Sequence, residues 1–309
     1  MTGVADMTDK PQSARLSVLI PFAIITLIWG STWLVIRDQI AVVPAVWSVT
    51  YRFLIAGALM TAIALVRREA FPRDARGLAI VAAVGLGQFC VNFNFVYRAE
   101  AHITSGLVAV VFALLLLPNA LLSRIVLGQR MSKQLLLGSG IAMAGVALLI
   151  VREARIDPAG PHETVVGVAL TLCGILGSSL ANVTQATRTA RAYPMFATVG
   201  MAMLLGTAVD AALAWHFAGP PMIEHRLGYL IGILYLSVFA SAIAFPLYYR
   251  IIRVIGPAKA AYNSVIVPVI AMLLSTLFEG YRWSPLAVAG ALVCATGLVI
   301  ALTARRPNR

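Results

Sequence analysis

The sequence predicts an all-α membrane protein with ten transmembrane helices, arranged as two inverted repeats of five helices each. Three observations support this fold class: an apolar composition, ten long apolar stretches between residues 18 and 304, and a second half that repeats the first. Of the 309 residues, 60% are hydrophobic and only 12% are charged. A soluble domain of this size would lack the polar residues that cover a water-exposed surface, so we expect the chain to lie in a lipid bilayer.

A helix needs about 20 predominantly apolar residues to cross roughly 30 Å of hydrocarbon. The stretches that approach this length, in chain order, are 18–36, 46–66, 78–97, 103–123, 135–151, 165–187, 194–217, 227–250, 260–278 and 285–304. They predict the following units: an N-terminal tail over 1–17, a first repeat over 18–152, a linker over 153–164, a second repeat over 165–304 and a C-terminal tail over 305–309. The first 17 residues lack the apolar core and cleavage site of a signal peptide, so we expect the first span to remain as a signal anchor.

Short patterns in the two halves match at a constant offset of 152 residues. The matches are Tyr97-Arg98 with Tyr249-Arg250, Gly128, Arg130 and Ser132 with Gly280, Arg282 and Ser284, and GSGIAMAG from Gly138 with GALVCATG from Gly290. Because each half contains an odd number of spans, the second half enters the membrane in the opposite orientation. Inverted repeats of this kind build many secondary transporters.

The formal charge of +12 is distributed unevenly about the predicted membrane. If the N-terminus is cytoplasmic, 17 Lys and Arg residues lie in cytoplasmic segments and 6 in the opposite segments. The positive-inside rule then places both termini in the cytoplasm, which predicts a multi-pass protein of the cell inner (plasma) membrane. Nucleic acid is not an expected partner, since no folded basic surface is predicted.

The sequence resembles one known family in its apolar helices and in the residues at the helix ends. The first span contains LIWGSTW, the second TYRFLIAGAL, the fourth TSGLVAVVFALLLLPNALLSR followed by LGQRMS, and the last two VPVIAMLLSTLFEGYRWSPLAVAGALVCATGLV. These segments resemble the drug/metabolite transporter superfamily, EamA type, from about residue 21 to 303. One departure concerns Gly128-Gln129, where many members carry Gly-Glu. An ion pair of that glutamate is therefore not expected here.

The resemblance implies a secondary transporter, driven by a gradient or by exchange, that exports a small organic metabolite or amphipathic compound by alternating access. The family handles amino acids, amphipathic drugs, sugars and nucleotide or lipid precursors, so the resemblance does not select a substrate. A lipid or lipid-precursor flippase and a passive channel are the alternatives. We expect a small-molecule substrate and the lipid bilayer as partners, and a homodimer is a further expectation.

The sequence predicts neither catalysis nor a cofactor or metal site. The four histidines fall at or beyond the outer helix ends, and the chain lacks H-E-x-x-H, G-x-S-x-G and phosphate-loop motifs. The three cysteines, Cys90, Cys173 and Cys294, are isolated in apolar helices and form no metal-ligand pattern.

Two prolines fall in corresponding spans, Pro118 in the fourth and Pro268 in the ninth, at an offset of 150. Proline removes a backbone hydrogen bond, and the freed carbonyl needs another partner or water. The two prolines therefore indicate either a substrate pathway or simple kinks that shape the bundle.

Polar residues within the spans recur at helical spacing, which places them on one face of each helix. Such stripes predict either a water-filled cavity or hydrogen bonds between helices. The predicted substrate-cavity residues are Trp29, Thr32, Gln88, Asn92, Pro118, Asn119, Ser178, Asn182, Ser241, Tyr248, Asn263 and Pro268. Aromatic rings beside neutral amides would suit an amphipathic ligand.

Arg52 and Asp210 are the only charged residues well inside the predicted spans. An unpaired charge at the membrane centre costs roughly 2.5–3.5 kcal/mol, so both residues need a partner, neutralisation or water. One hypothesis is that Asp210 couples transport to a proton gradient, with Arg52 as its partner or as an anchor for a substrate anion. The alternative is that Arg52 snorkels outward and Asp210 caps a helix end.

Small residues repeat along the fifth and tenth spans. Gly138 with Gly145, and Gly290 with Gly297, have the same seven-residue spacing. Glycine lets helix backbones approach closely. These faces are predicted to pack against neighbouring helices or a second copy of the chain.

Overall fold

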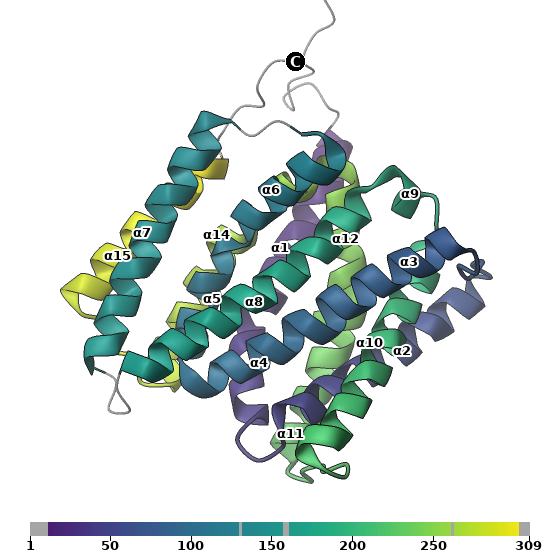
Figure 1. Ribbon diagram of the computed structural model, residues 1–309, viewed down its shortest axis with the longest axis horizontal. Coiled ribbons are helices and arrows are strands. Elements are labelled where there is room, and N and C mark those ends of the chain that lie inside the picture. Colours follow the sequence, from purple (N-terminus) through teal and green to yellow (C-terminus); the bar gives the residue numbers. More distant parts are fainter. Residues whose placement is uncertain (1–11, 130–131, 157–160, 261–262, 303–309) are drawn as a thin grey trace, which may run out of the picture.

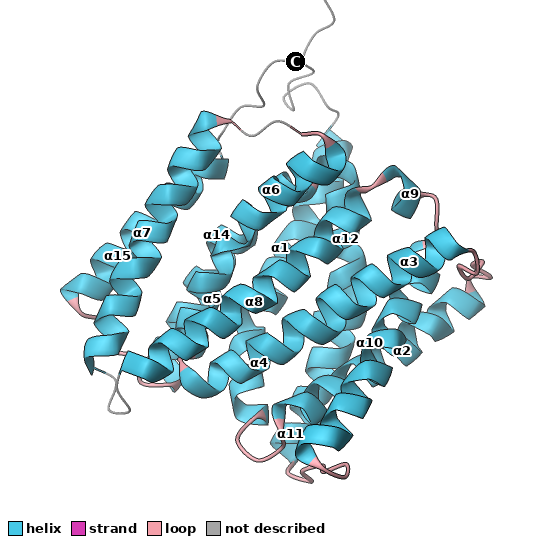
Figure 2. Ribbon diagram, in the orientation of Figure 1, coloured by secondary structure: helices cyan, strands magenta, loops and turns pink. Residues whose placement is uncertain are grey.

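The computed structural model describes residues 12–129, 132–156, 161–260 and 263–302, and every regular element in these ranges is helical (Figures 1 and 2). The predicted all-α class is confirmed. Eight helical stretches of the described chain are long and apolar enough to cross a membrane, and two shorter apolar helices follow, Ile266–Phe278 and Pro285–Ala301. Residues 1–11 of the predicted N-terminal tail, residues 157–160 of the predicted linker and the whole C-terminal tail lie outside the described residues.

Several spans consist of more than one helical segment. The first half contains α1 (Gln12–Gln39), α2 (Ala45–Val66), α3 (Ala75–Val84), η2 (Gly85–Asn92), α4 (Phe93–His102), α5 (Ser105–Phe112), η3 (Ala113–Leu115), α6 (Leu116–Leu127) and α7 (Lys133–Ile156). The second contains α8 (Pro161–Ala186), α9 (Arg188–Arg191), α10 (Met195–Ala218), α11 (Leu227–Ser237), η4 (Val238–Ile243), α12 (Ala244–Ile255), α13 (Pro257–Ala260), α14 (Asn263–Phe278) and α15 (Pro285–Leu302).

The third span ends later than the sequence predicts. It runs through α4 to His102, five residues beyond the predicted end at Tyr97. The chain leaves the helix only at Ile103, and Thr104, which has extended backbone angles, is the N-cap of α5. The extra turn carries Glu100, whose side chain is buried. Glu100 is therefore a further buried charged residue near the end of a span, which the predicted bounds left outside.

The third and eighth spans each contain a π-helical segment at matching positions. These segments are η2 and η4, which begin at Gly85 and Val238. A π-helical turn holds an extra residue, and such segments occur often at functional sites. The π-helical segments begin 153 residues apart, within one residue of the offset of the sequence repeat.

The contacts between helices also follow that offset. The fifth and tenth spans (α7 and α15) pack together at one edge of the bundle, and the second and seventh (α2 and α10) pack together on the other side (Figure 1). In the same way, α1 packs against α12 of the eighth span, and α8 packs against α4 of the third. This arrangement is what an inverted repeat predicts, although the repeat itself stays a prediction.

Glycines bring α7 and α15 into backbone contact. A Cβ atom on Gly145 would lie 2.6 Å from the Gly290 carbonyl oxygen, and one on Gly297 would lie 2.6 Å from the Gly138 carbonyl oxygen. Real Cβ atoms do not approach other atoms so closely, so neither position tolerates a side chain without movement of the helices. The small-residue faces therefore pack against each other within one chain.

A side-chain hydrogen bond joins the start of α3 to the segment before α10. The Tyr193 hydroxyl donates to Asp74 Oδ2 at 2.5 Å, and Asp74 also caps α3 by accepting from the Gly77 N–H. The bond from Tyr193 holds the pKa of Asp74 below its ordinary value of 3.8.

Removing this bond is expected to cause a pH-dependent loss of stability. A carboxyl whose pKa is lower in the folded state stabilises the fold above its unfolded pKa, and this contribution disappears as the pH falls through the folded pKa. Tyr193→Phe should therefore lower the thermal midpoint at neutral pH, and the difference from wild type should shrink as the pH falls below 3.8 and vanish below the lowered pKa of Asp74. Thermal unfolding of the purified protein across this range measures it. A difference that persists in acid would contradict the assignment.

Candidate substrate cavity

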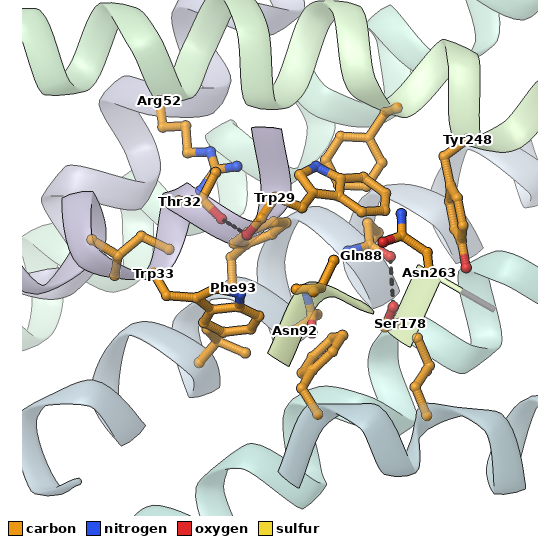
Figure 3. Close-up of a pocket in the computed structure, with 16 residues that line it drawn as sticks. Trp29, Thr32, Trp33, Arg52, Gln88, Asn92, Phe93, Ser178, Tyr248 and Asn263 are labelled. Atoms are coloured by element: carbon orange, nitrogen blue, oxygen red, sulfur yellow. Dashed lines mark hydrogen bonds between the residues drawn. The ribbon is translucent and has the colours of Figure 1, made fainter. Parts of the chain in front are cut away.

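A central cavity lies between helices of both halves of the chain (Figure 3). Its walls come from α1, α2, η2, α4, α5, η3, α8, α12 and α14. The lining residues are Trp29, Thr32, Trp33, Ile36, Arg52, Gln88, Asn92, Phe93, Val96, Phe112, Leu115, Ser178, Phe245, Tyr248, Asn263 and Val267. The cavity volume is about 90 Å³, which is room for several water molecules. A larger solute requires the surrounding helices to separate.

Neutral polar side chains gather on one side of the cavity. The Ser178 hydroxyl of α8 donates to Gln88 Oε1 of η2 at 3.0 Å. Asn92, one turn further along the third span, leaves its Oδ1 without a hydrogen-bond partner, and Asn263 of α14 leaves both amide atoms without one. Because unpaired buried polar groups are costly, these amides are suited to hydrogen-bond a polar solute or water.

Arg52 of α2 lies on the opposite side of the cavity (Figure 3). Its side chain is 1% exposed. Nε donates to the Ser241 hydroxyl at 2.9 Å and Nη1 donates to the Tyr97 hydroxyl at 3.3 Å. The guanidinium also lies over the Phe93 ring, 4.4 Å from its centroid. Among the described residues no carboxylate lies within ion-pair distance of Arg52, so its positive charge has no direct counter-ion in that part of the chain.

Aromatic rings form the wall between the two polar sides. Trp29 of α1 packs edge-on against Tyr248, with 4.8 Å between the ring centroids. Its ring is tilted against that of Phe245, with 5.4 Å between the centroids. Its indole N–H donates to the Ala240 carbonyl of η4 at 3.1 Å. The hydrogen bond fixes the orientation of the ring and occupies an otherwise free donor.

The structure brings seven of the twelve predicted cavity residues to this cavity and leaves five elsewhere. Those that line it are Trp29, Thr32, Gln88, Asn92, Ser178, Tyr248 and Asn263. Those that do not are Pro118, Asn119, Asn182, Ser241 and Pro268.

Four of these five residues are not in contact with the cavity for separate reasons. Pro118 lies in α6, after the 3₁₀ turn η3, and Leu115 at the end of that turn lines the cavity instead. Asn119 and Asn182 are buried at other positions and their amides have no partner. Pro268 lines a separate pocket between α5, α14 and α15.

Ser241 acts on the cavity indirectly. Its hydroxyl donates to the Leu236 carbonyl of α11 at 2.8 Å and accepts the bond from Arg52. The π-helical segment η4 thereby positions the arginine.

Asp210 lies apart from the cavity and from Arg52. It is fully buried in α10, and Asn94 Nδ2 donates to its Oδ1 at 2.7 Å, while Oδ2 has no partner. The predicted pairing with Arg52 is wrong in this structure, because the arginine hydrogen-bonds to Ser241 and Tyr97. The alternative is wrong as well, since Arg52 does not reach outward and Asp210 lies within the helix rather than at its end.

The sequence reasoning missed the apolar wall of the cavity. Val96 and Val267 each lie four residues after a predicted cavity residue, on the same helix face. A search for polar stripes passes over them because they are apolar. Extending each predicted face by one helical turn would have found them.

Comparison with known proteins identifies the family. The sequence profile of the EamA-like transporter family matches residues 16–151 and 165–303, which are close to the two predicted repeats. The chain belongs to the EamA-like transporter family. Several of its relatives are named as transporters or exporters.

The EamA relatives include Protein PagO of Salmonella typhimurium, 23% identical over 293 residues, with 94% of each chain covered. The "Uncharacterized inner membrane transporter YedA" of Escherichia coli is 30% identical over 256 residues and covers 82% of this chain and 80% of its own length. A "Probable terminal-alkyne amino-acid exporter" of Streptantibioticus cattleyicolor is 24% identical over 233 residues, covering 74% of this chain and 73% of its own. A crystal structure with a TM-score of 0.66 and 21% identity, covering 94% of this chain and 98% of its own, shows the same fold.

Proposed function

We propose that this EamA-family protein is an inner-membrane secondary transporter for small amphipathic organic solutes that carry an acidic group. The observation that carries this proposal is the environment of Arg52. The arginine is buried, lines the central cavity and has no carboxylate within ion-pair distance among the described residues. A solute carboxylate beside it would supply the missing counter-ion.

The chemistry of arginine favours this class of solute. Its planar guanidinium binds a carboxylate through two parallel hydrogen bonds, and charge-assisted bonds of this kind are roughly twice as strong as neutral ones. The aromatic wall next to Arg52 suits the apolar body of the solute. The amides of Gln88 and Asn263 on the far side suit a second polar group.

The size and position of the cavity support alternating access. The cavity is lined by spans of both halves and has only about 90 Å³ of room, so a solute must enter a more open state. Two inverted halves that rock about a fixed central site provide such states. The matched π-helical segments lie beside the cavity and can take part in this motion.

The proposal includes export, cytoplasmic termini and a gradient or exchange as the source of energy. The positive-inside distribution supports the orientation of the termini. The printed name of the Streptantibioticus relative supports export. A lipid flippase remains the alternative, and a passive channel is a further one.

A matched set of three probes tests the solute class. Phenylacetate, 2-phenylacetamide and phenethylamine share one ring but are anionic, neutral and cationic. Binding to the protein in nanodiscs can be followed by tryptophan fluorescence, because Trp29 and Trp33 line the cavity. We expect phenylacetate to bind at least about tenfold more tightly than either analogue, since only it supplies the missing counter-ion.

Flux into protein-containing liposomes then separates transport from the alternatives. Saturable phenylacetate flux without ionic conductance supports a transporter. Large single-channel currents would indicate a channel, and preferential scrambling of a labelled phospholipid would indicate a flippase. Equal or tighter binding of phenethylamine would overturn the proposed solute class.

A further inference from the structure

Two glutamates from the two halves of the chain meet at one serine hydroxyl. Glu100 lies in the last turn of α4 and Glu279 directly follows α14. The hydroxyl of Ser105, at the start of α5, lies 3.1 Å from Glu100 Oε2, 2.7 Å from Glu279 Oε1 and 3.2 Å from the Trp33 carbonyl oxygen. A serine hydroxyl has one hydrogen to donate. It therefore satisfies one of these three acceptors, so at least one of the two glutamate oxygens has to find a hydrogen elsewhere.

Other buried oxygens at this place also have no partner. Glu100 is 0% exposed and its Oε1 makes no hydrogen bond in the described structure. Ser275 is 1% exposed, and its hydroxyl has no partner either. It lies one turn before Glu279 on the same face of α14, and its Cβ is 3.1 Å from the place of a Cβ on Gly106, the neighbour of Ser105. The unpartnered hydroxyl is a second and independent indication that a ligand belongs here.

The surrounding charges do not neutralise two carboxylates. The charged groups that act on Glu100 are Glu279, Arg37 of α1 and Arg52 of α2, together with the phenol of Tyr97 on its own helix. Neither arginine forms an ion pair with Glu100 in the described structure. Glu100 also lies at the C-terminal end of α4, where the helix dipole disfavours a negative charge. Like charges held close together disfavour each other's charged form.

Two other titratable side chains at this end of the bundle are already paired with each other. His102 of α4 and Glu163 of α8 pair with each other. They form a separate unit and contribute no hydrogen bond to the glutamate pair.

We propose that Glu100 and Glu279, bridged by Ser105, form a proton-binding site that is loaded and emptied during the transport cycle. The role in transport rests on the proposed function, whereas proton binding does not. The contacts of the Ser105 hydroxyl with Glu100 and Glu279 have the lengths of hydrogen bonds. The described residues also contain no group of three His, Cys, Asp or Glu side chains placed to hold a metal ion.

The site is connected to the central cavity through one residue. Tyr97 accepts a hydrogen bond from Arg52 and precedes Glu100 by three residues, about one helical turn. A proton on Glu100 removes a negative charge that acts on Arg52 without pairing with it. The freed positive charge favours a bound carboxylate, and by linkage a bound carboxylate favours the proton. The acid and the proton therefore move together, down the gradient of the solute.

Infrared difference spectroscopy during a pH titration tests proton binding without any solute. We expect wild-type protein to show a protonated carboxyl band that is lost as the pH rises. Glu100→Gln and Glu279→Gln should each remove this band or move its midpoint by at least about one pH unit. Ser105→Ala should move the midpoint and serves as a second variant if the glutamine variants fold poorly.

Two matched controls locate the band. Glu163→Gln replaces a glutamate at the same end of the bundle, and Asp210→Asn replaces the coupling residue that the sequence predicts. Both should leave the band in place. The proposal is overturned if wild type lacks the band, if Asp210→Asn alone removes it, or if sodium in place of choline shifts it as a bound cation would.

The proposed coupling between the glutamate pair and the central cavity is tested by the pH dependence of phenylacetate binding. Between roughly pH 6 and pH 8 phenylacetate stays ionised, and its affinity for wild type should rise about tenfold as the pH falls, within the usual range of coupling between sites. Glu100→Gln should bind it with no pH dependence. A pH-independent wild type would overturn the link to Arg52. If phenylacetate fails to bind at all, the proposed function fails while the infrared result still decides the proton site.

Discussion

Arg52→Gln should lower the affinity for phenylacetate by about 30-fold or more. Truncating one member of a buried, hydrogen-bonded charge pair costs 2–5 kcal/mol, and about 2 kcal/mol corresponds to this factor. Glutamine retains a polar group of moderate size but supplies no positive charge. Arg52→Lys should lose less, because lysine keeps the charge and loses only the two parallel hydrogen bonds. Fluorescence titration in nanodiscs measures both variants.

Two controls accompany this prediction, a neutral probe and a variant of another arginine. Affinity for the neutral 2-phenylacetamide should change little in Arg52→Gln, which separates a loss of charge recognition from a general loss of structure. Arg98→Gln removes an exposed arginine of α4, beside Tyr97, and should leave phenylacetate binding unchanged. If Arg52→Gln binds phenylacetate as wild type does, Arg52 is not the anchor.

The second large effect is expected at the contact between α7 and α15. Gly145→Leu and Gly297→Leu should each lower the thermal midpoint by about 5–10 °C, because the new side chain enters the backbone of the facing helix. The Cβ of residue 145 would already lie 2.6 Å from the Gly290 carbonyl oxygen. Relief of this overlap requires the two helices to move apart along their length. Thermal unfolding of the protein in one detergent measures the shift.

Gly140→Leu is the matched control on the same helix. Gly140 is exposed, and nothing lies within 4 Å of the place of its Cβ. The substitution should shift the midpoint by no more than about 2 °C, because surface changes usually alter stability little. If Gly140→Leu and Gly145→Leu destabilise equally, leucine itself and not the helix contact is responsible.

The accuracy of the predicted cavity depended on where each helix face points. Gln88 and Ser178 were both selected from polar stripes on separate helices, and they hydrogen-bond each other at the cavity. Asn182 belongs to the same stripe as Ser178, yet it lies one turn away from the cavity. Helical spacing shows which residues share a face, but it does not show where along that face a neighbouring helix covers it.

For the charged residues too, the sequence predicts a need for partners, and the packing of helices decides which partners they have. The sequence predicts that Arg52 and Asp210 need neutralisation, because lipid solvates no isolated charge well. Their partners come from other spans: Ser241 lies 189 residues after Arg52 and Asn94 lies 116 before Asp210. Such distant pairs follow from packing. Glu100 was missed for another reason, since the predicted span ends at Tyr97 whereas α4 continues to His102, with Ile103 as its C-cap.

The sequence by itself determined the all-helical membrane class, the approximate spans and the close contact expected of the glycine-rich helices. These features follow from local properties, namely the hydrophobicity of each stretch and the size of each side chain. Only the tertiary structure decided that Arg52 meets Ser241 and Tyr97, and that Glu100 and Glu279 meet at Ser105. Those contacts join residues from different helices, and the bilayer imposes no register between helices, so side-chain packing alone sets which polar groups come together.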